Sequence, residues 1–138
     1  MIQSPDLTLV RRVAWGLGGV LWFFWIAYED RGLEALTFVA VVIAFAAGLT
    51  VLNRWVGGEK LAQRKWLLRT GAVGLVAGAA VGPLTALLML VKLGLHVHPE
   101  PDFGPAQFIQ ALSRTIYWAG LGAMIGFALG LVVRNTRV

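Results

Sequence analysis

The residues best suited to chemistry lie in one polar loop, where two imidazoles and two carboxylates stand at alternate positions. These candidate metal ligands are His96, His98, Glu100 and Asp102. Such groups bind zinc, copper or iron, and an extended segment turns alternate side chains to one side. Their spacing matches no established metal motif. We therefore favour a stiff, polar exterior loop that contacts headgroups or a partner, and keep metal binding as the alternative.

Other catalytic chemistry has little support in the chain. It contains no cysteine, which excludes thiolate catalysis, disulfides and iron–sulfur ligation. Its two serines, Ser4 and Ser113, stand in no recognisable catalytic turn, and no phosphate-binding loop is visible. We expect no enzymatic activity, and the sequence requires no cofactor. A lipid, pigment or metal bound at the exterior loop is compatible with its residues.

The elements that would position this loop are long apolar segments. The chain is 58% hydrophobic and only 14% charged, a balance typical of a membrane protein. We predict one all-α domain over residues 1–138 with four transmembrane helices. These spans cover about residues 11–28, 33–52, 71–95 and 115–133, separated by a basic cytoplasmic loop (53–70) and an exterior loop (96–114). Within the exterior loop, Pro105 is expected to begin an amphipathic helix that lies on the bilayer.

Two ladders of glycine at every fourth position run along the third and fourth spans. Their members are Gly74, Gly78 and Gly82 in the third span, and Gly122, Gly126 and Gly130 in the fourth. Each ladder lies on one face of its helix, and small residues let helices in a membrane approach closely. We predict glycine-zipper packing of these two helices, and it is open whether both ladders face each other or one faces a different chain. Pro83 is expected to kink the third one, as a static bend or as a hinge.

The basic residues predict the orientation. With both termini in the cytoplasm, that side carries nine of them: Arg11, Arg12, Arg54, Lys60, Arg64, Lys65, Arg69, Arg134 and Arg137. The opposite side carries three: Arg31, Lys92 and Arg114. The positive-inside rule therefore predicts that both termini are cytoplasmic. Residues 59–68 of loop 53–70 could form a short helix along the membrane surface, with apolar contacts from Trp55, Leu61, Trp66 and Leu68. The five basic residues of this loop would contact lipid headgroups, and docking of a partner is the alternative. This placement beside apolar runs argues against nucleic-acid binding.

The absence of an ionisable residue near the middle of any predicted span argues against a proton pump. Our first hypothesis is a non-catalytic accessory subunit of a larger bacterial membrane complex, for example a respiratory or photosynthetic one. It would be a multi-pass protein of the cytoplasmic (inner) membrane, with lipid and other integral subunits as partners. One alternative is a small homo-oligomeric channel or transporter with Pro83 as hinge. Another is a metal-handling protein that uses His96 and His98.

Overall fold

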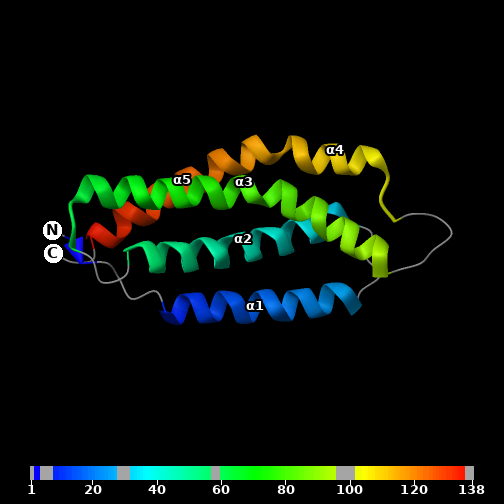
Figure 1. Cartoon of the computed structure of the whole chain (residues 1–138), viewed down its shortest axis with the longest axis horizontal. Coiled ribbons are helices and arrows are strands. Elements are labelled where there is room, and N and C mark those ends of the chain that lie inside the picture. The colour runs from blue at the N-terminus through cyan, green and yellow to red at the C-terminus, as the bar shows by residue number, and fades with distance from the viewer. Residues whose placement is uncertain (1, 4–7, 28–31, 57–59, 96–101, 136–138) are drawn as a thin grey trace.

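The computed structural model describes residues 2–3, 8–27, 32–56, 60–95 and 102–135, and it is a helical bundle (Figure 1). Its helices are α1 (Thr8–Ala27), α2 (Leu33–Val56), α3 (Gln63–Leu95), α4 (Pro105–Ser113) and α5 (Thr115–Asn135). Long runs of apolar residues favour helices in a membrane because a helix satisfies its backbone hydrogen bonds internally.

Three segments of the described chain are long and apolar enough to cross a membrane. They are Leu33–Trp55 in α2, Gln63–Leu95 in α3 and Pro105–Val132 across α4 and α5. The predicted all-helical class is confirmed. The first predicted span, residues 11–28, lies mostly in α1 and ends outside the described residues, so it stays a prediction.

Helix α3 is the centre of the packing. It contacts α2, α4 and α5, whereas α1 packs against α2 (Figure 1). The core lies between α2 and the second half of α3, where Leu36, Thr85 and Met89 have at most 1% of their surface exposed. Phe103 and Ala111 close this core from the α4 side. Helix α4, which follows the predicted metal-site residues, is thereby fixed against α3.

A short antiparallel pair ties the start of the chain to the connection between α2 and α3. Strands β1 (Ile2–Gln3) and β2 (Lys60–Leu61) pair with Ile2 opposite Leu61. The end of α5 lies at this same end of the molecule (Figure 1). We call it the basic end, because it carries Arg54, Arg64, Lys65 and Arg69.

The two predicted loops are shorter than expected. Helix α2 continues to Val56 and α3 begins at Gln63, so the expected loop 53–70 is largely helical. Residues from Gln63 onward contain no glycine or proline until Gly71, so nothing interrupts the helix there. The surface position expected for Trp66 is wrong, because this side chain is buried with 2% exposure.

The expected exterior loop 96–114 also contains helix. Pro105 begins α4 at its first turn, as predicted, and Gly104 precedes it as the N-cap. The N–H of Arg114 donates to the carbonyl oxygen of Gln110, and the N–H of Trp118 donates to that of Arg114. These bonds continue α4 into α5, and the two form one apolar segment. Whether α4 lies on the bilayer stays a prediction.

Pro83 lies inside α3, which continues through it as a helix. In Figure 1 the second half of α3 slopes away from the line of its first half. A proline in a helix leaves the carbonyl oxygen four residues earlier without its backbone donor, which here is that of Ala79, and a nearby hydroxyl such as that of Thr85 can bond a freed carbonyl. Instead the Thr85 hydroxyl donates to the carbonyl oxygen of Val81 at 2.8 Å. Whether Pro83 acts as a hinge stays a prediction.

Candidate functional site

The contact between α3 and α5 brings the two glycine ladders face to face. A Cβ atom placed on Gly74 would overlap the carbonyl oxygen of Gly122, and one placed on Gly122 would overlap the carbonyl oxygen of Gly74. The two backbones are therefore in direct contact at this point. Since a carbonyl oxygen cannot rotate away as a side chain can, only glycine fits here without moving a helix.

The same arrangement repeats along the interface. A Cβ on Gly78 would overlap the carbonyl oxygen of Trp118, and one on Gly126 would overlap that of Thr70. At one end, Gly82 faces the carbonyl oxygen of Ala111 and the hydroxyl of Thr115. At the basic end, Gly130 faces only side chains, those of Thr70 and Leu67. Substitution is therefore tolerated best at Gly130.

One further glycine at this interface lies outside both ladders. Gly71 leaves the space that the ring of Phe127 occupies, and a Cβ there would contact the ring at 2.5 Å. The sequence gave no reason to single out Gly71, because it lies three residues before Gly74 and breaks the four-residue spacing. Its role depends on how far α5 is offset along α3, which a repeat within one helix does not reveal.

Two side chains of α3 lie at the basic end of this interface, and one of them, Trp66, bonds across it. The indole N–H of Trp66 donates to the carbonyl oxygen of Gly130 at 3.1 Å. The hydroxyl of Thr70 donates within its own helix, to the carbonyl oxygens of Trp66 and Leu67. A buried hydrogen bond of this kind contributes about 1 kcal/mol. Trp66 thus fixes the end of α5 against α3.

An apolar groove of about 300 Å³ runs beside this interface. Its lining residues come from α2, α3 and α5, together with Val10 of α1. The groove residues on α3 run from Trp66 to Val81. Gly74, Gly78, Gly122 and Gly126 all line it, so the hollow exists partly because these positions carry no side chain.

Of the five residues predicted to contact lipid headgroups, Arg69 has a defined position. It donates from Nη1 to the carbonyl oxygen of Trp55 at 3.1 Å, and its guanidinium carbon lies 5.7 Å from the centre of the Trp55 ring. Arg69 therefore links α3 to the end of α2. The side chains of Arg54, Arg64 and Lys65 are exposed, and that of Lys60 lies outside the described residues.

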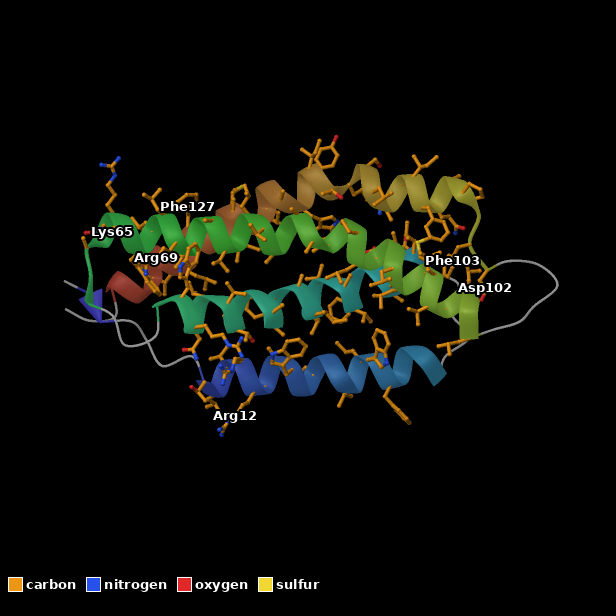
Figure 2. All side chains as sticks on the ribbon, viewed as in Figure 1. Arg12, Lys65, Arg69, Asp102, Phe103 and Phe127 are labelled. Carbon is orange, nitrogen blue, oxygen red and sulfur yellow. The ribbon has the colours of Figure 1, made fainter. Side chains whose placement is uncertain are left out.

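The predicted metal site is only partly within the described chain. His96, His98 and Glu100 lie outside it, and Asp102 is half-buried next to the buried Phe103 (Figure 2). Among the described residues, no three histidine, aspartate or glutamate side chains come together to hold a metal ion. The four-ligand prediction is therefore untested.

Sequence reasoning missed a buried cation close to this site. Lys92 has 2% of its surface exposed, and its Nζ lies 6.0 Å from the centre of the Phe103 ring. A lysine near the end of an apolar run can reach toward water, which would leave its side chain exposed. Phe103, which precedes α4, lies beside the lysine instead, a contact between two elements that no local pattern predicts.

No family model, curated protein or solved structure matches this chain. Its geometry shows two closely packed helices with an apolar groove beside them.

Proposed function

We propose that this chain is a non-catalytic accessory subunit of a larger membrane protein complex, for example a bioenergetic one, in a bacterial cytoplasmic membrane. The observation that carries this proposal is the wide apolar face of α5 that the rest of the chain leaves uncovered. Ile116, Tyr117 and Met124 are 81%, 79% and 70% exposed.

The three apolar segments differ in how much of them the chain itself covers. In the most apolar part of α2, 39% of the residues are buried, against 11% in the segment formed by α4 and α5. Because the glycine face of α5 already contacts α3, a neighbouring subunit would bind its other side. Aromatic residues and methionine, both present on that side, are enriched at protein interfaces.

The proposal includes four spans and two cytoplasmic termini. Support comes from the nine basic residues predicted on the terminal side against three on the other. The position of β1 and the end of α5 at one end of the molecule is compatible with this orientation (Figure 1).

The test is native mass spectrometry of the complex extracted in mild detergent from its own membrane, without overexpression. Co-migration with other integral subunits at fixed stoichiometry is the expected result. A pure homo-oligomer would contradict the proposal and favour a channel or transporter. A chain that is monomeric in every mild detergent would also contradict it.

A cross-linking experiment locates the contact. Because the chain has no cysteine, a single Met124→Cys substitution gives one reactive site on the exposed face of α5. Phe38→Cys on α2, 58% exposed, is the matched control. We expect a heterobifunctional cross-linker to capture another subunit from Met124→Cys and much less from Phe38→Cys. Equal yields would show that α5 is not the preferred contact.

A further inference from the structure

The groove between α2 and α5 is long and lined by apolar residues. From Trp66 to Val81 it extends along fifteen residue steps of α3, or about 22 Å. This exceeds the ~15 Å depth of one leaflet, which is half of the hydrocarbon core. Its volume of about 300 Å³ lies at the lower limit for small-molecule sites.

The polar side chains that line the groove already have hydrogen-bond partners within the protein. Its hydroxyl group, from Thr70, donates to backbone carbonyl oxygens of α3. Its indole N–H from Trp66 donates to the Gly130 carbonyl oxygen. The remaining wall is mostly aliphatic, with Val73, Leu121 and Ile125 among its members. A hydrocarbon chain therefore suits it better than any polar ligand.

One end of the groove is positively charged. Arg69 lies between Trp66 and Val73 on α3, three and four residues from two lining positions, and so borders the groove. In Figure 2 Arg69 lies on the side of α3 that faces α2, and Lys65 is exposed. The Arg69 guanidinium donates to the Trp55 carbonyl oxygen, and as a planar cation it is well suited to phosphate.

From the apolar interior and this basic end we infer that the groove holds one acyl chain of an anionic phospholipid, with its phosphate beside Arg69. The lipid comes from the leaflet at the basic end. The inference rests on the membrane-spanning arrangement of the proposed function and is independent of any partner subunit. The lipid would fill a space that the glycines of α3 and α5 leave open.

The test uses the full chain in phosphatidylcholine nanodiscs that contain a small fraction of phosphatidylglycerol with a diazirine on its acyl chain. Photo-cross-linked peptides are mapped by mass spectrometry, and unlabelled phosphatidylglycerol or phosphatidylcholine competes for the site. We expect cross-links concentrated on groove residues such as Val73 and Ile125, and stronger competition by phosphatidylglycerol. Correct reconstitution is checked by co-flotation with the lipid, so failure to enter the membrane is distinguished from failure to bind in the groove.

Two pairs of variants separate the chain from the headgroup. Val73→Trp fills the groove and is expected to abolish groove cross-links. Val76→Trp, at a position of α3 where the native valine is 66% exposed, is expected to leave them intact. Arg69→Gln is expected to lower the preference for phosphatidylglycerol about fivefold, the equivalent of one basic residue near the surface. Lys65→Gln should change it much less. Arg69→Lys, which keeps the charge, should retain most of the preference.

Three results would overturn the inference. Cross-links spread evenly over the exposed faces and unchanged by Val73→Trp would show ordinary lipid contact. Equal competition by the two lipids would show that the site does not recognise an anionic headgroup. Chain-to-chain cross-links that exclude lipid from the groove would show that a second copy covers it.

Discussion

Replacing Gly122 with alanine tests the packing of α3 against α5 most directly, because Gly120 supplies a matched control two residues away. A Cβ at position 122 would overlap the Gly74 carbonyl oxygen and lie 2.9 Å from the Gly78 Cα atom. A Cβ at position 120 would meet nothing within 4 Å. Both substitutions add one methyl group to the same helix, so only the environment differs.

The expected free energies follow from two terms. Replacing glycine by alanine within a helix favours folding by up to about 1 kcal/mol, and this gain applies at both positions. Overpacking an interface that cannot yield costs about 1–3 kcal/mol, and this cost applies only at Gly122. We therefore expect Gly120→Ala to raise stability slightly and Gly122→Ala to fall about 1–3 kcal/mol below it.

The assay is unfolding of the detergent-solubilised chain by added sodium dodecyl sulfate, followed by tryptophan fluorescence, with circular dichroism to verify equal helix content before titration. Gly74→Ala approaches the same contact from α3. Because either substitution forces the helices apart, the double variant should cost less than the two single costs added together. Equal midpoints for Gly120→Ala and Gly122→Ala, or strict additivity of Gly74→Ala and Gly122→Ala, would refute the backbone contact.

Two further predictions concern the ends of the bundle. Lys92→Ala should destabilise the chain by about 2 kcal/mol, because it removes a buried side chain that packs against Phe103. Lys65, on the same helix, is exposed, so Lys65→Ala should change the unfolding midpoint little. Equal shifts for the two variants would argue against the burial of Lys92. For the orientation, an impermeant maleimide should label Lys65→Cys only in inverted vesicles and Ala106→Cys only from the periplasmic side; the reverse pattern would place the termini outside.

Much of the helical architecture could be predicted from the sequence, because long apolar runs and glycine spacing are local signals. The face that carries Gly74 and Gly78 follows from the helical period alone. That this face meets Gly122 and Gly126 depends on the relative position of two helices, and the sequence left it open. The early start of α3 was missed for a related reason: basic residues before Gly71 indicated a surface segment, whereas the burial of Trp66 is decided by the end of α5.

The candidate site was harder to predict. Attention to titratable residues directed the sequence analysis to His96 and His98, which lie outside the described residues. The groove contains almost no titratable group, and it forms from residues on four helices that have no common motif. Only the basic character of residues 53–70 hinted at lipid, and it did not distinguish Arg69 from its exposed neighbours.

Helix packing and the groove are linked through the same glycines. Gly74 and Gly122 touch across the interface and also line the groove, so a methyl group at either position both separates α3 from α5 and narrows the hollow. Alanine at these positions should therefore weaken lipid binding and stability together. Val73→Trp narrows the hollow from a position outside the glycine contacts, so it should remove the lipid while leaving the α3–α5 contact in place. Lipid binding that survives Gly122→Ala but not Val73→Trp would show that the chain lies nearer α2 than α5.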